Sequence, residues 1–432
     1  MSRLDPPTFG NGMTMEKRPR IGVLYHFFHP DDVVSARIFS EFCADLCQRG
    51  WEVSAWPCNR VCHDAIHSYP LTEEWQGVTI RRIWRPAFRQ ASALGRFLNA
   101  AWMLAAWCVK LLGDRRNRPN VLVIGTDPVF GILIAPVVRK LLPDIRIVHW
   151  CFDLYPEYAI AEGMFRADSW LIRGLKRILP TAYASCDLVA DLGICMRSRL
   201  ADYGHTCRKT TLTPWALAEP PAVERPDPVT RHELFGKNPL GLLYSGNFGR
   251  PHSYADLLSL ARRLRGSGIH FAFGVRGSRS EELRQAVQPE DTNVSFAGFA
   301  PEAALVKRLA AADIHVVSLR PEYTGLAVPS KFFGSLASGR PVIFSGTNDS
   351  AQAQWIEEFK IGWVLNERTQ ERVAAELLEL RSRPEKLQEL QQHCFHVYHK
   401  HFSRNSVLDE WDRELRALVS SNLGLPVPSR LP

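Results

Sequence analysis

The segment Val328-Pro-Ser-Lys-Phe-Phe-Gly-Ser-Leu-Ala-Ser-Gly-Arg-Pro-Val-Ile343 carries more information about this chain than any other stretch of similar length. Its order predicts a loop, a short helix that opens at Ser330 and Lys331, a stop at Gly339 and a buried strand. A helix N-terminus presents unpaired N–H groups and the positive end of a dipole, so it favours anions. Ser330 is a good N-cap residue, and Lys331 adds a positive charge beside it. The segment is either an anion site or a capped surface helix with a solvated lysine.

Strand and helix patterns alternate along both halves of the chain, as in parallel sheets that are covered by crossover helices. The strands expected in the first half are 20–25, 51–56, 121–125, 145–150 and 188–192, with a helix at 35–49. In the second half we expect strands 240–245, 269–275, 294–296 and 314–319, with helices 253–265, 302–311 and 406–419. The pattern predicts an α/β protein with two doubly wound, Rossmann-like domains.

The chain divides at a proline-rich stretch. Four prolines predict a stiff, non-helical stretch from Glu219 to Pro228, and we place a Pro-rich linker over 219–239. This linker separates a first domain, 20–218, from a second domain, 240–400, and we expect 401–432 to supply a helix that packs back on the first domain, followed by a tail. Residues 1–19 are expected to be a disordered tail. Because they lack the apolar core of a secretory signal, the sequence predicts a cytoplasmic protein.

Composition excludes several classes of protein. At 432 residues, with 46% hydrophobic and 23% charged residues, the chain is too long for one core and has the make-up of a globular protein. Its ten cysteines show no paired metal spacing, which favours reduced, small hydrophobic side chains over disulfides or zinc ligands. Asp31 and Asp32 have no companion ligand at a suitable spacing, and we expect no metal.

Positive charge is concentrated in one window. Residues 81–118 hold nine basic residues and one acidic residue, and their net charge of +8 equals that of the whole chain. Within the window, 97–109 is an uncharged helical run, too short for a bilayer span of about 20 residues. Two interpretations are open: a helix that lies on an anionic membrane surface, or a buried helix with a solvated basic rim. No nucleic-acid-binding motif accompanies the window, so nucleic acid is not expected as a partner.

A glycine-containing turn follows an expected strand of the second domain. Gly246-Asn-Phe-Gly-Arg250 stands at the carboxyl end of that strand, where open α/β sheets bind ligands. Its glycines allow backbone N–H groups to approach a phosphate, and Arg250 can make a bidentate contact with it. Together with Ser330 and Lys331 at another strand end, the turn predicts a diphosphate clamp. His252 either adds a third donor or faces water at the start of a helix.

Acidic residues follow a strand of the first domain. Asp153 comes after the expected strand 145–150, which places its carboxylate at the interdomain face. There it can orient or deprotonate an acceptor hydroxyl, or it can cap the next helix. Glu157 is a second acid of the same segment, or a solvated side chain. His149, near the end of the strand, is expected to be a packed core histidine.

Taken in order, these motifs resemble those of GT-B fold glycosyltransferases of family 4, in the branch that builds bacterial surface polysaccharides. The resemblance extends from Arg20 to about Val419. The matching segments of the first domain are Tyr25-His-Phe-Phe-His-Pro30, Ser35-Ala-Arg37, Gly50-Trp-Glu-Val53 and Asp153-Leu-Tyr-Pro-Glu157. Those of the second domain are Tyr244-Ser-Gly-Asn-Phe-Gly-Arg250, Val294-Ser-Phe-Ala-Gly298, Ala312-Asp313 and the 328–343 segment.

The resemblance implies a retaining, metal-independent sugar transfer of the EC 2.4 hexosyltransferase type, without a cofactor. The donor substrate would be a UDP- or GDP-sugar in the second domain, and the acceptor a saccharide or polyprenyl-linked saccharide in the first. The residues placed at the donor are Gly246, Asn247, Gly249, Arg250, Gly298, Ser330 and Lys331. A lipid-linked acceptor agrees with the basic 81–118 window and with a peripheral position on the inner face of the cytoplasmic membrane.

The chain departs from the family at two positions. The family carries two glutamates eight residues apart, where this sequence has Leu326 and Gly334. The second glutamate holds the ribose hydroxyls of the donor, and the first contacts its sugar or phosphates. Neither leucine nor glycine can do this through a side chain, so Glu322 is the candidate to replace them by a loop shift. A glycine within a helix is also unfavourable, and the small residue at 334 is expected to make room for something.

Three functions are open at this point. The first is a glycosyltransferase in which Arg250 and Lys331 neutralise the leaving diphosphate and Asp153 orients the acceptor. The second is a non-catalytic GT-B scaffold or partner subunit of a transferase complex, which the missing glutamates favour and the two cations oppose. The third is a sugar-nucleotide epimerase on the same fold.

Overall fold

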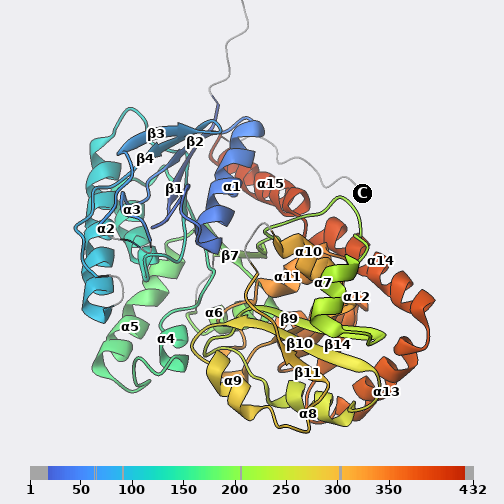
Figure 1. The fold of residues 1–432 in the computed structure, drawn as a ribbon. Helices are drawn as coiled ribbons and strands as arrows, with labels where there is room; N and C mark the ends of the chain where they lie inside the picture. The colour runs from blue at the N-terminus through green and yellow to red at the C-terminus, as the bar shows by residue number, and fades with distance from the viewer. Residues whose placement is uncertain are drawn as a thin grey trace, which may run out of the picture.

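The computed structural model describes residues 18–423, apart from 63, 65, 90, 91, 205, 206 and 301–303. Two α/β domains lie next to each other, and the chain returns from the second to the first through two long C-terminal helices (Figure 1). The tail expected at 1–19 lies outside the described residues up to position 17. The first strand begins at Arg20, as the sequence predicts.

The first domain is built on an eight-stranded sheet. Its order is β3-β4-β2-β1-β5-β6-β7-β8, and only β3 and β4 are antiparallel neighbours. The strands are β1 (Arg20–Leu24), β2 (Glu52–Ala55), β3 (Thr72–Trp75), β4 (Val78–Arg81), β5 (Val121–Ile124), β6 (Arg146–Trp150), β7 (Leu188–Asp191) and β8 (Arg208–Thr211). The sequence predicted five of them within two residues and missed β3, β4 and β8.

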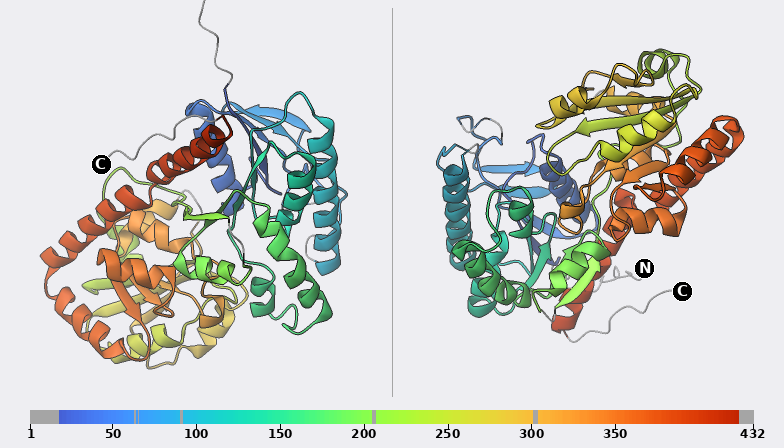
Figure 2. Two further views of the ribbon diagram at one scale, coloured as in Figure 1. Left: turned by 180° about the vertical axis from the view of Figure 1, so that it is seen from behind. Right: turned by 90° about the horizontal axis from the view of Figure 1, so that it is seen from below.

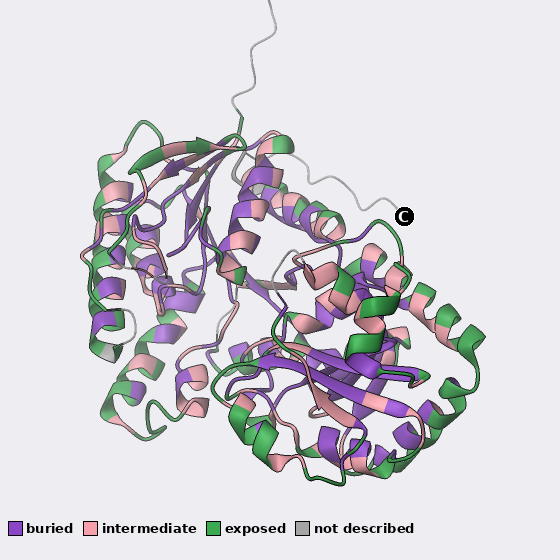
Figure 3. Cartoon of the chain, viewed as in Figure 1, coloured by how far each residue is buried: buried purple, intermediate pink, exposed green. Residues whose placement is uncertain are grey.

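Helices cover both faces of this sheet, which explains why its central strands are continuous runs of buried apolar residues (Figure 3). On one face α1 lies beside the C-terminal helix α15, and on the other α2, η1, α3 and α5 form a connected layer. The helices of this domain are α1 (Val34–Gln48), α2 (Ala93–Gly113), η1 (Gly131–Ile134), α3 (Ala135–Leu141), α4 (Glu157–Ala161), α5 (Trp170–Ala184) and α6 (Ile194–Ala201).

The second domain contains a six-stranded, fully parallel sheet in the order β11-β10-β9-β12-β13-β14. The strands are β9 (Leu240–Asn247), β10 (Ile269–Arg276), β11 (Val294–Phe296), β12 (Ile314–Ser318), β13 (Val342–Ser345) and β14 (Gly362–Leu365). Its helices are α8 (Ala255–Arg263), α9 (Ser280–Ala286), α10 (Leu305–Ala311), η3 (Pro321–Tyr323), α11 (Lys331–Ala337), α12 (Ala351–Phe359) and α13 (Gln370–Arg381).

The segment between the domains is non-helical from 219 to 227, as the sequence predicts. The rest of the 219–239 linker contains α7 (Pro228–Phe235), which was not predicted. Asp227 caps this helix, because its Oδ1 accepts a hydrogen bond of 2.9 Å from the N–H of Thr230. Pro228 occupies the first turn, where proline's missing N–H is harmless. A proline that was interpreted as a helix breaker therefore marks the start of a helix.

Two helices carry the chain back to the first domain (Figure 2). They are α14 (Pro384–His401), which packs on α11 and α13, and α15 (Arg404–Leu423). Trp411 of α15 is fully buried, with its ring centroid 5.1 Å from Phe42 and 4.8 Å from Trp150. The indole N–H of Trp51 donates to Asp412 over 2.6 Å. The C-terminal helix is thus part of the core of the first domain.

The basic window 81–118 is less exposed than its composition predicts. Arg82 and Arg85 are buried, and Arg81 forms an ion pair of 3.0 Å with Asp114. Its uncharged run lies in α2, which buries Met103, Trp107 and Leu111 and turns further apolar side chains outward. None of the described helices is both long enough and apolar enough to cross a membrane.

Candidate active site between the two domains

The loops that follow the strands of both sheets meet between the domains. The N–H of Leu154, just after β6, donates to the carbonyl of Leu326 over 2.9 Å. Tyr323 of η3 donates to a carboxylate oxygen of Glu162 over 2.8 Å, and its ring lies edge-on to Tyr158. The sequence-predicted residues at strand ends are therefore brought to one interdomain region, where open α/β sheets bind ligands.

Lys331 supplies a half-buried positive charge to this interdomain region. Its Nζ lies 3.4 Å from Nε2 of His252 and 5.4 Å from the centroid of the Tyr244 ring. Within the part of the chain that the structure describes, no carboxylate forms an ion pair with it. Burial lowers the pKa of Lys331 to about 8. A bound anion would therefore strongly stabilise the charged form of Lys331.

His252 holds Lys331 rather than facing water. The histidine is 8% exposed, and its Nδ1 lies 2.8 Å from the carbonyl oxygen of Ser318, to which it donates. Nε2 is then an acceptor for the ammonium of Lys331. Burial, and then the charge of Lys331, lowers the pKa of His252 to about 3, so the ring stays neutral. Both sequence interpretations of His252 are wrong, because its role depends on a contact with β12.

The glycines of the 246–250 segment make room for Lys331. The strand β9 continues through Asn247, so the segment begins as strand and turns afterwards. Gly246 has φ +128°, and a Cβ added there would lie 2.7 Å from Cε of Lys331. Gly249 has no such conflict, since its nearest neighbour would be 3.4 Å away. Gly277, which the sequence analysis missed, packs against the same loop: a Cβ there would lie 2.5 Å from Oδ1 of Asn247.

Arg250 reaches across to the first domain. Its Nη1 donates to the carbonyl oxygen of Glu162, and its Nε lies 3.9 Å from that residue's carboxylate. The arginine side chain is 58% exposed, in contrast to Lys331. In this arrangement its guanidinium bridges the domains, and a phosphate would have to compete with Glu162 for it.

Ser330 does not cap α11. Its backbone is already helical, with φ −60° and ψ −23°, and its side chain accepts no capping hydrogen bond. The helix itself is seven residues long. The predicted capping role of Ser330 is wrong, because an N-cap residue needs an extended backbone to turn its hydroxyl back onto the helix. The positive charge at this strand end comes mainly from Lys331.

The remaining residues that were predicted to bind the sugar donor lie at the edge of the interdomain region. Glu322 is exposed in η3 and accepts a hydrogen bond of 3.2 Å from Arg320. Gly298 is exposed after β11, and its carbonyl accepts from Arg308. No hydrogen bond or ion pair joins either residue to Lys331 in the described part of the chain.

The two positions that depart from the family have different environments. Leu326 is 2% exposed and packs into the core of the first domain, so its side chain serves the domain contact. Gly334 in α11 borders open space, since a Cβ added there would find only Leu309 Cδ1, at 4.0 Å. The structure thus has room for a side chain at 334 but not for a polar one at 326.

On the facing side, Asp153 follows β6 with an unusual electrostatic environment. Its carboxylate accepts no hydrogen bond from the described residues, while the loop around it is fixed by Thr126, whose Oγ1 accepts from the N–H of Phe152 over 2.8 Å. Burial, and then the charge of Asp127, raises the pKa of Asp153 to about 7. A carboxyl group that titrates near neutral pH is suited to accept a proton from a hydroxyl.

Asp127 and His26 complete this side, and the sequence analysis missed both. Asp127 follows β5 as Asp153 follows β6, and its Oδ1 lies 3.2 Å from Nδ1 of His26. The rule that selected Asp153, an acid directly after a buried strand, also selects Asp127. The pairing with His26 has no signal in the sequence, because the two residues are 101 positions apart.

Two other predictions for this segment have clear outcomes. Glu157 is not solvated, because both of its carboxylate oxygens accept from the hydroxyl of Tyr203, at 2.8 and 2.9 Å. His149 is a packed core histidine, as predicted: it is 3% exposed and its Nδ1 donates to the carbonyl of Ile124 over 2.9 Å. Burial lowers the pKa of His149 to about 4.

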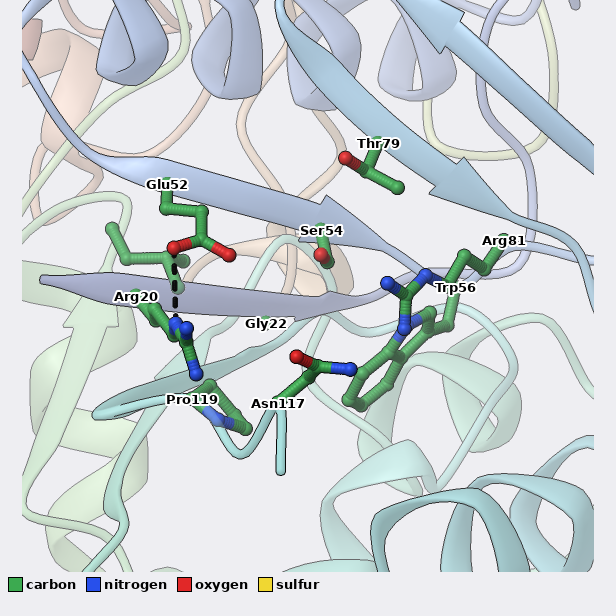
Figure 4. Close-up of a pocket in the computed structure, with 10 residues that line it drawn as sticks. Arg20, Gly22, Glu52, Ser54, Trp56, Thr79, Arg81, Asn117 and Pro119 are labelled. Atoms are coloured by element: carbon green, nitrogen blue, oxygen red, sulfur yellow. Dashed lines mark hydrogen bonds and ion pairs between the residues drawn. The ribbon is translucent and has the colours of Figure 1, made fainter. Parts of the chain in front are cut away.

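A pocket on the first sheet lies away from these residues (Figure 4). It is lined by residues of β1, β2 and β4 and by the loop before β5, including Arg20, Glu52 and Asn117. Arg20 and Glu52, at the starts of their strands, form an ion pair of 2.9 Å. Because its charges are already paired and it extends from the amino ends of the strands, we do not assign the active site to this pocket.

Comparisons with known proteins agree with this geometry. Residues 239–383 match the family model described as Glycosyl transferases group 1. "Probable glycosyltransferase WbjE" of Pseudomonas aeruginosa is 26% identical over 283 residues, which cover 64% of this chain and 70% of that protein. Sucrose-phosphate synthase from Thermosynechococcus elongatus superposes with a TM-score of 0.69 at 15% identity, over 94% of this chain and 100% of that one. Anabaena HepE in complex with UDP superposes with a TM-score of 0.63 at 9% identity, over 92% of this chain and 100% of that one.

Two Rossmann-like domains whose strand ends face each other, together with these structural neighbours, define the GT-B fold, and the predicted fold class is confirmed. The match of residues 239–383 to the group 1 glycosyl transferases places the sequence similarity in the second domain. The predicted glycosyltransferase resemblance is confirmed at this level.

Proposed function

We propose that the protein is a retaining glycosyltransferase of family 4 that moves a hexosyl group from a nucleotide diphosphate donor to a hydroxyl of a lipid-linked saccharide, in bacterial surface-polysaccharide synthesis. The observation that carries the proposal is the placement of two groups on the two sides of the interdomain contact: the ammonium of Lys331, which has no carboxylate partner among the described residues, and the carboxyl of Asp153, which accepts no hydrogen bond from them. One is suited to a leaving diphosphate and the other to an acceptor hydroxyl. The relatedness to a glycosyltransferase of Pseudomonas aeruginosa supports the same reading.

The donor diphosphate would bind at Lys331 and at the backbone of the 246–249 loop. As the bond between the anomeric carbon and the diphosphate oxygen breaks, its electron pair stays on the diphosphate, and the ammonium neutralises the growing charge. The side chain is held in place by His252 and Gly246 before any ligand arrives, so little reorganisation is needed. Arg250 would exchange Glu162 for the donor phosphate as substrate enters. The two cations supply the positive charge that a metal would otherwise provide, which supports a metal-independent reaction.

A uridine or guanosine diphosphate sugar is the proposed donor. Anabaena HepE, which shares the fold, is described in complex with UDP, and this supports a nucleotide at the second domain. With Gly334 and Leu326 in place of the family's glutamates, the ribose would be held less tightly than in the family. Glu322 remains our candidate for a compensating contact, through movement of η3.

The outward side of α2 is proposed to rest on the cytoplasmic face of the membrane. Its exposed apolar side chains recur every three to four residues and form one stripe: Leu94, Phe97, Leu98, Trp102, Val109 and Leu112. Exposed arginines flank the helix at both ends, at positions 89, 115 and 116. An apolar stripe with basic flanks suits the anionic headgroup layer.

The start of α5 adds to this surface. Trp170 is 79% exposed, and Met164, Phe165 and Leu171 are exposed beside it. In α/β units the helix N-termini lie at the sheet edge that carries the strand carboxyl ends, so this apolar end of α5 lies at the same edge as Asp153. A membrane at this edge would bring a lipid-linked acceptor to the carboxylate.

Ligand-induced stabilisation tests the donor part of the proposal. Thermal unfolding would be measured with UDP-, GDP- and dTDP-sugars, and a donor at 100 times its Kd should stabilise the protein by about 2.7 kcal/mol. Stabilisation by none of them at saturating concentration would favour the non-catalytic scaffold. Incubation with the stabilising sugar nucleotide, with and without lipid-linked acceptors, then separates the remaining functions, because an epimerase converts the donor alone. Cosedimentation with anionic vesicles at low salt tests the membrane surface, with Val109→Glu as the disruptive variant.

A further inference from the structure

Three neighbouring strands of the first domain end in ionisable side chains. β1, β5 and β6 are consecutive parallel neighbours, and His26, Asp127 and Asp153 follow them in that order. The three side chains therefore lie in a row along the carboxyl edge of the sheet. Asp153 is at the end of the row that contacts the second domain, through the adjacent Leu154.

The first two members form a tight, partly buried ion pair. His26 is 1% exposed, and its Nδ1 lies 3.2 Å from Asp127 Oδ1, while the Asp127 side chain is 35% exposed. The backbones are linked as well, since the N–H of His26 donates to the carbonyl of Asp127 over 2.8 Å. Burial alone would lower the pKa of His26, but Asp127, and after it Cys58, outweigh burial and raise the pKa to about 9. The imidazole is thus a fixed cation behind Asp127.

The second and third members interact through their charges. Thr126, immediately before Asp127, binds the loop of Asp153, because its Oγ1 accepts from the N–H of Phe152 over 2.8 Å. The carboxyl groups of Asp127 and Asp153 are held on neighbouring loops, where the charge of Asp127 opposes ionisation of Asp153. One of them has a cation beside it and the other has none.

We infer that His26 and Asp127 are positioning residues for Asp153: the buried His26 ring holds the Asp127 carboxyl group on the loop beside Asp153, and the Asp127 charge leaves the role of proton acceptor to Asp153. This inference rests on the proposed transferase function for its reaction, but not for its electrostatics. Two carboxyl groups with separated roles are a recurrent way to place an acid or base near neutral pH.

In the reaction, the acceptor O–H bond breaks and its proton passes to a carboxylate oxygen of Asp153. The oxygen lone pair forms the new bond to the anomeric carbon on the same face from which the diphosphate leaves, as retention requires, and the bond to the diphosphate breaks with its electron pair on the diphosphate at Lys331. His26 and Asp127 touch neither substrate in this scheme. They act only by fixing the charge beside Asp153.

Other ionisable groups around the row do not carry the effect. Burial raises the pKa of the neighbouring tyrosines and of two cysteines, so these stay neutral: Tyr25, Cys62, Cys151, Tyr155 and Tyr158. Cys58 is the second partner of His26; burial raises its pKa, but His26 and Arg85 outweigh this and lower it. The imidazolium therefore faces Asp127 on one side and the Cys58 thiol on the other.

The charge of His26 can be measured without any substrate. In protein labelled with ¹⁵N-histidine, the ring signals of His26 are identified by their loss in His26→Gln. We expect an imidazolium at pH 7.5 that titrates near pH 9, and a neutral ring at the same pH in Asp127→Asn. A neutral His26 in the wild-type protein at pH 7.5 would overturn the inference, whatever the protein's activity.

The pH profile of transfer tests the coupling to Asp153. The wild-type kcat/KM should rise with pH, and this rising limb of the pH profile should have an apparent pKa of about 7. Asp127→Asn should move this limb about one pH unit down, because a negative neighbour is lost, and His26→Gln about one unit up, because its counter-charge is lost. Glu157→Gln is the matched control, since its carboxylate faces Tyr203, and it should leave the limb in place.

The outcomes separate the inference from the proposed function. A lower rate with an unmoved limb in Asp127→Asn, which changes a part-exposed side chain and is expected to fold, would show a purely structural role and reject the coupling. Shifts of the same sign in both variants would reject it as well. If the wild-type protein transfers no sugar at all, the proposed function fails, and the NMR titration alone decides whether His26 and Asp127 form the charged pair.

Discussion

The two sides of the interdomain site hold their charges in opposite ways. On the second domain, Lys331 is a half-buried cation whose partners are a neutral imidazole and an aromatic ring, and burial lowers its pKa to about 8. On the first domain, Asp153 is a half-buried acid beside another acid, and its pKa is raised to about 7. In both places the free protein disfavours the charged form. The charged form of each group is stabilised only when a substrate supplies the partner that the free protein lacks.

The difference lies in how each side is built. The cation side is local: Gly246, His252 and Lys331 follow strands of one sheet, and a small residue makes the room that the lysine stem needs. The acidic side is electrostatic, since the environment of Asp153 depends on a buried histidine two strands away. Mutations on the cation side should therefore change the shape and charge of the site around Lys331. Mutations on the acidic side should change how activity depends on pH.

Removing the cation should have the largest effect. Lys331→Ala is expected to lower the transfer rate by about 10²- to 10³-fold, because one preorganised charge at a leaving group is worth about 3–4 kcal/mol. Thermal unfolding should change little, since the variant also removes a buried charge. Steady-state transfer assays measure the loss, and Lys360→Ala, at a side chain that is 77% exposed, is the control. A loss below about tenfold would remove Lys331 from this role.

Crowding the lysine should have the next largest effect. In Gly246→Ala the new Cβ would lie 2.7 Å from Lys331 Cε, so the ammonium must move. We expect nucleotide affinity to fall by about tenfold or more, in line with a displaced charge-assisted hydrogen bond. Isothermal titration with the stabilising nucleotide measures this.

Two glycines serve as controls for Gly246→Ala. Gly266→Ala carries the strain of a positive φ, +72°, with no neighbour within 4 Å, and Gly249→Ala tests the same loop without a close contact. Gly266→Ala should bind nucleotide normally, and Gly249→Ala, whose backbone belongs to the proposed site, should lose less affinity than Gly246→Ala. Equal loss of affinity in Gly246→Ala and Gly249→Ala would show that the loop tolerates no side chain anywhere, and that Lys331 is not the reason.

How much of this could be read from the sequence differs between the two sides. Lys331 and the 246–250 segment were predicted because ligand sites in α/β folds follow strands, and the strands are continuous apolar runs. The role of His252 could not be predicted, since it depends on the Ser318 carbonyl of another strand. Ser330 was predicted as a cap from its residue type, but capping depends on backbone angles that residue type does not determine.

On the acidic side, the sequence pointed to Asp153 but not to what surrounds it. Asp127 was available from the same rule, and His26 was hidden within an apolar segment where a buried charge is not expected. Composition also overstated the exposed positive charge of the 81–118 window, because Arg82 and Arg85 are buried. Charge counts along a sequence do not distinguish an exposed arginine from a buried one.

Neutralising the acidic side should stabilise the protein in a pH-dependent way. A carboxyl group whose pKa is raised in the folded state destabilises the fold as pH rises above its unfolded value, about 3.9, toward its folded value, about 7. The full pKa shift corresponds to about 4 kcal/mol at pH 8, and the partial exposure of Asp153 reduces it. Asp153→Asn should therefore raise the free energy of unfolding by about 2 kcal/mol at pH 8, and by less than half as much at pH 5. Denaturant unfolding at the two pH values measures this, with exposed Asp349→Asn as the control. Equal effects at both pH values would contradict the raised pKa.

Restoring a family residue should have the smallest and most specific effect. Gly334 lies in α11 with open space where a Cβ would be, so Gly334→Ala and Gly334→Glu should both fold and gain up to about 1 kcal/mol from the loss of a helical glycine. The resemblance implies that a glutamate here would bind the ribose hydroxyls, and a hydrogen bond to a charged group would improve nucleotide affinity by about tenfold. The difference in Kd between the two variants isolates this contact, because their backbone gain is shared. If both bind alike, the ribose lies elsewhere, and the cation side holds its donor through the diphosphate alone.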